Sequence, residues 1–426
     1  MTAIAAGSAH TAAATDAGGG RGLRFLLLAG QLLGLLAVFH FYRLESPLFS
    51  RLAVVCFVGF AIHYWLPAAW RYRFFVGFSV VGYGVLLTPL VAGLIIATGL
   101  VFFAIVRSPL PWWCRIAGIA IVGAACTVGR TTGVPGVPAA FWPILGSLFM
   151  FRLLVYLYDV RYAKEPPRLL DFLGYFLLLP NCCFLLFPVV DHATFLVSRD
   201  RRPLAEVAQT GVRWIARGAV QLVLYRFIDA YRPDPAVADT VGSVIAYMVM
   251  TYLLYLRLSG QFHIAIGMIH LFGFDLPETH RRYLLASSVS DFWRRINIYW
   301  KDFIVKLFYM PVFFRLRRSG EVRAAAIATV VAFVATWILH SWQWYWLLGS
   351  PLLTWPDTLF WAILGGLMVH ATVQETRRKG RPPERSRLGQ AFAVARTFAL
   401  IVVLWSLWQS SSLEAWWQLV SLRGGS

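Results

Sequence analysis

The feature that most constrains this chain is a series of apolar runs, most of them close to twenty residues long. A helix needs about 20 apolar residues to cross the hydrocarbon core of a bilayer. The long run 74–106 contains Pro89, which favours two shorter segments or a re-entrant turn. We therefore expect an all-α polytopic transmembrane protein with about 11–13 membrane segments, including re-entrant or interfacial helices around a central chamber. The expected segments are 23–42, 51–70, 74–106, 112–128, 139–158, 169–190, 211–229, 240–258, 298–314, 324–348, 356–373 and 391–409.

Composition supports a membrane protein. Hydrophobic residues make up 59% of the chain and charged residues 14%, whereas a soluble domain has about 25% charged residues. The 18 Trp and 17 Tyr suit aromatic belts at membrane interfaces. The net charge of +19 is explained by basic cytoplasmic loops and anionic lipid, so we expect the lipid bilayer as a partner and no nucleic acid.

Composition predicts the domain organisation of the chain, and the distribution of charge predicts its orientation. Residues 1–22 are expected to form a disordered tail, and 23–426 a single multi-helix membrane domain. The segment 349–357 has one acid and no base, and placing it outside requires two spans between 323 and 377. We expect a multi-pass protein of the inner (cytoplasmic) membrane. The basic clusters placed inside are Arg199, Arg201, Arg202, Arg213 and Arg217; Arg315, Arg317, Arg318 and Arg323; and Arg377, Arg378, Lys379, Arg381, Arg385 and Arg387.

Residues 259–306 differ from an ordinary loop. Their apolar stretches are too short to span a bilayer, and ionisable residues alternate with aromatic ones. Irregular backbone at membrane depth is tolerated where it is buried in protein or lines a wet cavity. His263 and His270 are spaced by seven, and without an evident third ligand they predict polar lining or core histidines and no metal site. This segment predicts a reaction chamber or a permeation path.

Five stretches, in the same order, resemble the membrane-bound O-acyltransferase superfamily, as found in bacteria. SSVSDFWRRINI, from residue 287, with WKDFIVKLFYMPVF after it, is similar to the family's central motif. The stretches around it are SGQFHIAIGMIHLFGFDLPE (259–278), LGSLFMFRLLVYLYDV (145–160), LLLPNCCFLLFPVVDHATF (177–195) and WILHSWQWYW (337–346). The resemblance covers residues of about 140–375, which would be the catalytic core.

The resemblance implies transfer of an acyl group, acetyl or short acyl, from a thioester to a hydroxyl of a cell-envelope glycan, lipid or related acceptor. His340 would be the general base and Asn297 would stabilise the oxyanion or orient the carbonyl. The alternatives are that Asn297 only caps a helix and that His340 is a neutral core residue. The residues proposed to contact substrate are Trp293, Arg294, Arg295, His263 and Trp344.

The resemblance implies no tightly bound cofactor, and a donor that is a coenzyme A thioester or an acyl carrier protein. Arg294 and Arg295 would bind the donor's phosphates, or else lie on an interfacial helix against lipid phosphates. Envelope-biosynthesis proteins are expected partners. Two other functions fit the residues: a transporter or flippase for an anionic envelope precursor, and a non-catalytic membrane subunit of a polysaccharide complex. Departures from the family pattern at Asn297, His263 and Ser341 bear on the acceptor.

Overall fold

The computed structural model describes residues 18–186, 190–379 and 385–422. The regular elements in these ranges are helices, and the extended contacts among them amount to an isolated bridge between Arg199 and Phe274. The prediction of an all-α protein is confirmed. Residues 1–17 of the predicted tail lie outside the described residues, and helix α1 already begins at Gly18.

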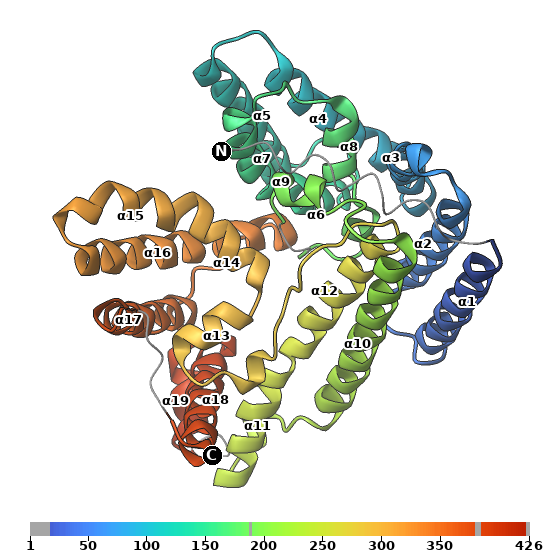
Figure 1. Cartoon of the computed structure of the whole chain (residues 1–426). Coiled ribbons are helices and arrows are strands. Elements are labelled where there is room, and N and C mark those ends of the chain that lie inside the picture. The colour runs from blue at the N-terminus through green and yellow to red at the C-terminus, as the bar shows by residue number, and fades with distance from the viewer. Residues whose placement is uncertain (1–17, 187–189, 380–384, 423–426) are drawn as a thin grey trace.

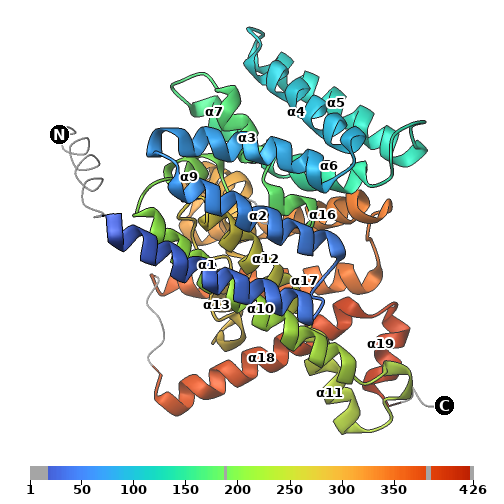
Figure 2. The same ribbon diagram turned by 90° about the vertical axis from the view of Figure 1, so that its right-hand side faces the viewer.

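The first half of the chain forms a row of long helices followed by short ones. The order is α1 (Gly18–Phe41), α2 (Pro47–Trp65), α3 (Ala68–Leu86), α4 (Pro89–Arg107), α5 (Trp112–Thr132), α6 (Phe141–Phe149), α7 (Arg152–Tyr162), α8 (Leu169–Phe176) and α9 (His192–Val197), with a 3₁₀ turn η1 (Leu179–Cys182) between the last two. Successive helices from α1 to α5 pack as neighbours, as Figure 2 shows along one side of the molecule.

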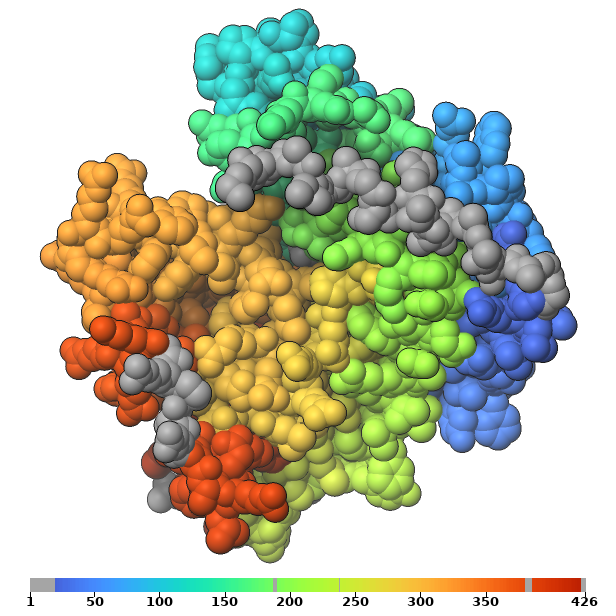
Figure 3. Space-filling model, viewed as in Figure 1, coloured from blue at the N-terminus to red at the C-terminus, as the bar shows by residue number. Residues whose placement is uncertain are grey.

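The second half surrounds a long central pair. It comprises α10 (Leu204–Tyr231), α11 (Val241–Leu253), α12 (Tyr255–His270), α13 (Val289–Arg295), α14 (Ile298–Ile304), α15 (Met310–Leu316), α16 (Glu321–Leu348), α17 (Trp355–Arg377), α18 (Arg387–Gln409) and α19 (Leu413–Val420). Helix α10 lies along α12 at the centre of Figure 1, and α16 packs along α17. The gold and orange chain of α13 to α15 spreads over the front face in Figure 3, between the green and red helices.

Eight helical segments of the described residues are long and apolar enough to cross a membrane. The run 74–106 divides at Pro89 as predicted, because α3 ends at Leu86 and α4 begins at Pro89 with Thr88 as its N-cap. The eight are Gly20–Phe41, Pro47–Trp65, Pro89–Arg107, Trp112–Thr132, Phe141–Tyr162, Val241–His270, Glu321–Leu348 and Arg387–Gln409.

Several expected segments are not single continuous α-helices: 139–158 is divided between α6 and α7, and 240–258 between α11 and α12. The prediction of a span at 169–190 is wrong, since α8 stops at Phe176 and a 3₁₀ turn containing Pro180 follows; proline lacks the N–H that would continue an α-helix. The segment 298–314 is interrupted by a π-helical turn, Val305–Tyr309, between α14 and α15. π-Helical turns are rare in proteins overall, and those that do occur are often found at functional sites.

Glycines allow the central helices α10 and α12 to approach closely. A Cβ on Gly218 would lie 2.5 Å from the carbonyl oxygen of Gly260, and one on Gly211 would lie 2.6 Å from that of Gly267. The reverse distances, from Gly260 and Gly267, are 2.9 and 2.7 Å. Small residues at this spacing let two backbones meet, a common basis of helix packing in membranes. We call these four residues the glycine seam.

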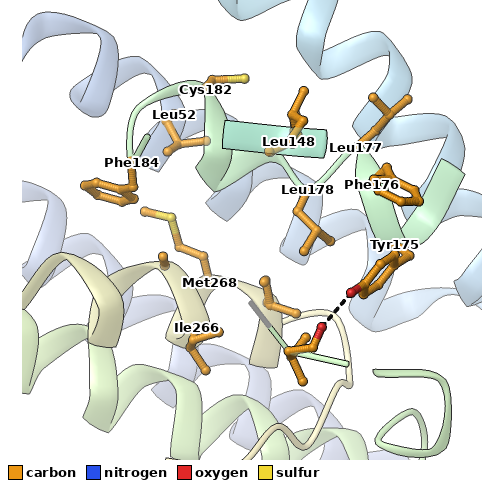
Figure 4. Packing of buried hydrophobic residues seen from close by; sticks show 14 of the residues in the cluster. Leu52, Leu148, Tyr175, Phe176, Leu177, Leu178, Cys182, Phe184, Ile266 and Met268 are labelled. Atoms are coloured by element: carbon orange, nitrogen blue, oxygen red, sulfur yellow. Dashed lines mark hydrogen bonds between the residues drawn. The ribbon is translucent and has the colours of Figure 1, made fainter. Parts of the chain in front are cut away.

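The main core lies where the short helices meet α12. Figure 4 shows Leu148, Leu178 and Met268 among the packed side chains there, with Tyr175 donating a 2.6 Å hydrogen bond to the carbonyl of Val190. The buried Arg152 of α7 donates to Asn181 Oδ1 at 2.8 Å and so ties α7 to the η1 turn.

Candidate functional site

His340 lies on the long helix α16, against three tryptophan rings from other helices. The centroid of its ring is 5.5 Å from that of Trp300, 5.2 Å from that of Trp361 and 5.9 Å from that of Trp408. Trp361 meets the imidazole edge to face, while Trp408 is nearly parallel to it. The site is therefore assembled by α14, α16, α17 and α18, and we call these three tryptophans the indole wall.

Polar atoms around His340 are enclosed without protein partners. His340 Nδ1, the hydroxyl of the next residue, Ser341, and Trp300 Nε1, whose ring contacts the imidazole, are buried and form no hydrogen bond within the described residues. Buried polar groups are normally hydrogen-bonded, so unpaired ones need a reason such as a ligand or water. The His340 residue as a whole keeps some accessible surface. A small polar reactant would satisfy these atoms.

Asn297 is joined to this site through Trp300. It has a positive φ of 38°, which Asn tolerates better than most residues, and it is the N-cap of α14. Its Oδ1 accepts a long hydrogen bond of 3.4 Å from the backbone N–H of Trp300. The structure thus brings both predicted catalytic residues to the same tryptophan, and Asn297 does cap a helix. Neither chemical role is tested by this geometry.

The short helix α13 holds the other motif residues. Trp293 packs on Phe333 of α16, with 4.7 Å between ring centroids. Arg294 donates to both oxygens of Glu375, at 3.0 and 3.3 Å, and Arg295 donates to Asp291 at 2.7 Å. Both guanidinium groups are therefore paired with carboxylates. Their binding of donor phosphates stays a prediction.

His263, on α12, belongs to a second buried polar group that includes Gln221 of α10 and His280. The imidazole is fully buried, and its Nδ1 is 2.8 Å from Gln221 Oε1. Its ring lies 5.8 Å from that of His280, whose Nε2 is 2.9 Å from the hydroxyl of Tyr255. His270 is equally buried, with Nδ1 2.9 Å from the carbonyl of Ile266. His263 makes no ring contact with the indole wall.

Trp344, also proposed to contact substrate, lies one turn after His340 on α16. It is partly buried. The neighbouring rings of Trp342, Tyr345 and Trp346 pack on one another at 5.3 to 5.9 Å. Its position places it on the same side of the helix as His340, and its role stays a prediction.

A cavity of about 170 Å³ lies beside the opposite face of α14. Tyr299 and Phe303 line it from α14, and Phe303 also packs on Trp300 at 5.3 Å. Lys306, from the π-helical turn, pairs with Asp159 and lies 3.6 Å from Asp191. Lys306 is thus an ion-pair partner of Asp159. Phe303 and Trp300 thus lie between this cavity and His340.

Sequence reasoning missed most of the indole wall. Trp300 stands in the quoted motif without a predicted role, and no sequence motif marks Trp361 or Trp408 as a site residue. Trp361 follows His340 by 21 residues and Trp408 by 68, in ordinary apolar runs. In a chain with 18 tryptophans, no local pattern distinguishes these from belt residues.

Together, the helices and the enclosed polar atoms define a multi-pass membrane protein with an internal site around one histidine. The model of the membrane-bound O-acyltransferase family matches residues 131–363, and the chain belongs to this family. The resemblance noted in the motifs is confirmed.

Two curated relatives are similar to about two thirds of this chain. "Probable alginate O-acetylase AlgI" of Azotobacter vinelandii is 23% identical over 294 residues, which are 65% of this chain and 52% of the relative. The protein of the same name from Pseudomonas aeruginosa is 22% identical over 288 residues, 65% of this chain and 50% of the relative. The chain thus spans about half the length of the curated relatives it matches.

Proposed function

We propose that this protein is an O-acyltransferase that moves an acetyl or short acyl group from a thioester to a hydroxyl of a cell-envelope glycan, lipid or related acceptor. The observation that carries the proposal is His340, held in the indole wall with Nδ1 enclosed and unpaired among the described residues. Membership of the family supports acyl transfer. The relatives' name, alginate O-acetylase, favours acetyl as the group and a polysaccharide as the acceptor.

His340 is the proposed general base. An imidazole among indole rings is costly to charge, and the neutral form is the one that accepts a proton. It takes the proton of the acceptor hydroxyl as that oxygen attacks the thioester carbonyl. The carbon–sulfur bond then breaks, and the departing thiolate receives the proton, which leaves an ester and a free thiol.

Asn297 is the proposed partner at the carbonyl oxygen. Its Oδ1 is used in capping α14, so the side-chain NH₂ group is the donor left for negative charge that develops on that oxygen. The donor is proposed to be a coenzyme A thioester or an acyl carrier protein, reaching the site from the cytoplasm in the inner membrane. Envelope-biosynthesis proteins are its proposed partners.

The test uses the full chain, purified in detergent, with acetyl-coenzyme A as probe and release of free thiol as the measurement. In parallel, a deletion strain is complemented with wild type or His340→Ala, and alkali-labile acetyl groups on envelope glycans and lipids are measured by mass spectrometry. We expect wild type to restore them and His340→Ala, inserted at the same level, to restore none. Restoration by His340→Ala would refute the mechanism.

The same assays separate the two other functions. A transporter or flippase would release no thiol from any thioester offered. A non-catalytic subunit would support acylation of the glycan in cells whether or not His340 is present.

A further inference from the structure

Asp357 binds three tryptophans at once. Its Oδ1 accepts from the indole N–H of Trp408 at 2.7 Å and of Trp361 at 3.2 Å, and its Oδ2 accepts from that of Trp337 at 2.8 Å. The residue is 3% exposed. An ionised carboxylate has about four acceptor positions, so most of its capacity is used by indoles.

These hydrogen bonds connect three helices, α16, α17 and α18, at the Asp357 carboxylate. Trp337 is on α16, three residues before His340; Trp361 is one turn after Asp357 on α17; and Trp408 is near the end of α18. The carboxylate is set at the start of α17, where Thr354 caps the helix and accepts from the backbone N–H of Asp357. A buried carboxylate is costly unless it is hydrogen-bonded, and a site that provides three donors to it is a built arrangement.

Two of the indoles bound by Asp357, those of Trp361 and Trp408, also belong to the indole wall. Trp361 and Trp408 meet His340 at 5.2 and 5.9 Å, and their own centroids are 5.9 Å apart. Phe360 stacks on the outer side of Trp408 at 4.7 Å. The orientation of both indoles is therefore fixed at one end by the Asp357 carboxylate and at the other by His340.

A catalytic histidine is usually oriented by a direct hydrogen bond from its second nitrogen to a carboxylate. His340 Nδ1 has no such partner among the described residues. The nearest arrangement of this kind is indirect, since the carboxylate holds the rings that contact the imidazole.

We propose that Asp357 is a positioning residue of the acyl-transfer site, which fixes the orientation of His340 through Trp361 and Trp408. This inference rests on the proposed function of His340. Removing the carboxylate leaves three buried indole N–H groups unpaired, and the rings then turn to find other partners. The imidazole loses its fixed orientation, so proton transfer slows while the substrates still bind.

Two variants separate positioning from a purely structural role. Asp357→Ala removes all three acceptors, whereas Trp337→Phe removes one hydrogen bond from the same carboxylate and leaves Trp361 and Trp408 bound to it. Among the described residues, Trp337 makes no ring contact with His340, so Trp337→Phe is the matched control for loss of stability. Trp408→Phe keeps an aromatic ring beside His340 but cannot donate to Asp357.

The first readout is kinetic, on monodisperse folded protein with acetyl-coenzyme A. We expect Asp357→Ala and Trp408→Phe to lower kcat by at least about tenfold with KM for acetyl-coenzyme A changed by less than about threefold, and to shift the pH profile of kcat. Trp337→Phe should keep wild-type kcat. If Asp357→Ala does not fold, Asp357→Asn, which retains one acceptor oxygen, takes its place beside Trp408→Phe.

The second readout needs no activity. Diethyl pyrocarbonate modifies accessible imidazoles, and mass spectrometry of the peptide that contains His340 gives its rate of modification. We expect the rate to rise several-fold in Asp357→Ala and Trp408→Phe and to stay unchanged in Trp337→Phe. Wild-type kcat, pH profile and modification rate in Asp357→Ala would overturn the inference. Absence of thiol release by the wild-type protein would instead count against the proposed function, and the modification rates would still decide the role of Asp357.

Discussion

The indole ring of Trp300 packs on the imidazole of His340, with 5.5 Å between their centroids, and this contact joins the two stretches that carry the predicted catalytic residues. Trp300 is 8% exposed, and its backbone N–H is bound by the side chain of Asn297. The motif helix α14 and the membrane helix α16 thus meet at Trp300 and His340. The behaviour of variants at Asn297 follows from this relationship.

Substitutions at Asn297 should separate capping from chemistry. Asn297→Asp keeps an oxygen for the helix cap and tolerates the positive φ of 38°, but it has no NH₂ group. We expect Asn297→Asp to keep near wild-type thermal stability and to lose kcat by roughly 10²–10³-fold, the usual effect of removing one oxyanion donor. Asn297→Gly, which suits the backbone but lacks both groups, is the control: it should lose activity equally and stability by a few tenths of a kcal/mol or more.

The measurement for Asn297 is thiol release together with thermal unfolding in detergent. Wild-type kcat in a folded Asn297→Asp protein would mean that Asn297 serves α14 alone.

The glycine seam predicts a sharp difference between two Gly→Ala substitutions. A Cβ on Gly218 would meet the Gly260 carbonyl oxygen at 2.5 Å and Ile264 at 2.7 Å, so α10 and α12 must move apart. We expect Gly218→Ala to destabilise the protein by roughly 1–3 kcal/mol, as overpacking does. Gly77→Ala, on α3 with nothing within 4 Å of its Cβ, is the control and should be neutral or slightly stabilising.

Apparent melting temperature, followed by size-exclusion chromatography of heated samples, compares the two glycine variants. Equal melting temperatures would show that α10 and α12 do not depend on close backbone contact.

His280 predicts acid sensitivity of the fold. Burial, and then the charges of His263 and Arg217, hold the pKa of His280 well below its usual 6.5. Between the folded and unfolded pKa values the unfolded chain binds the proton, so the stability is complete above about pH 6.5 and falls as the pH drops below it. We expect His280→Gln, which does not titrate, to lose less melting temperature than wild type between pH 7 and pH 5.

Thermal unfolding at a series of pH values checks the role of His280. The hydroxyl of Tyr255, 2.9 Å from Nε2, keeps an acceptor in the Gln variant, so a difference in slope reports the titration. Parallel pH dependence in the two proteins would contradict the prediction.

The long apolar helices of the chain follow closely from the sequence. Apolar runs and Pro89 predict the helices α1 to α5, and the loop 349–357 between basic clusters predicts the pair α16 and α17. These are local properties, because a bilayer requires each crossing segment to satisfy its own backbone. The failure at 169–190 has the same origin: hydropathy does not register the loss of a hydrogen bond at Pro180.

The candidate site could be located only from sequence motifs and tertiary structure together. Motif residues identify Asn297 and His340, but the sequence interpretation used Asp357 only as an acid in an outer loop. The structure buries that carboxylate among tryptophans up to 51 residues away, and it pairs Asp159 with Lys306, 147 residues on.

The sequence alone thus determined that the chain is a helical membrane protein and which stretches contain the proposed catalytic residues, since apolar length and motif residues are local properties of the sequence. The tertiary structure decided what surrounds His340. Which face of α17 and α18 turns toward α16 is set by side-chain packing among many helices, and the hydropathy of each helix carries no information about its rotation.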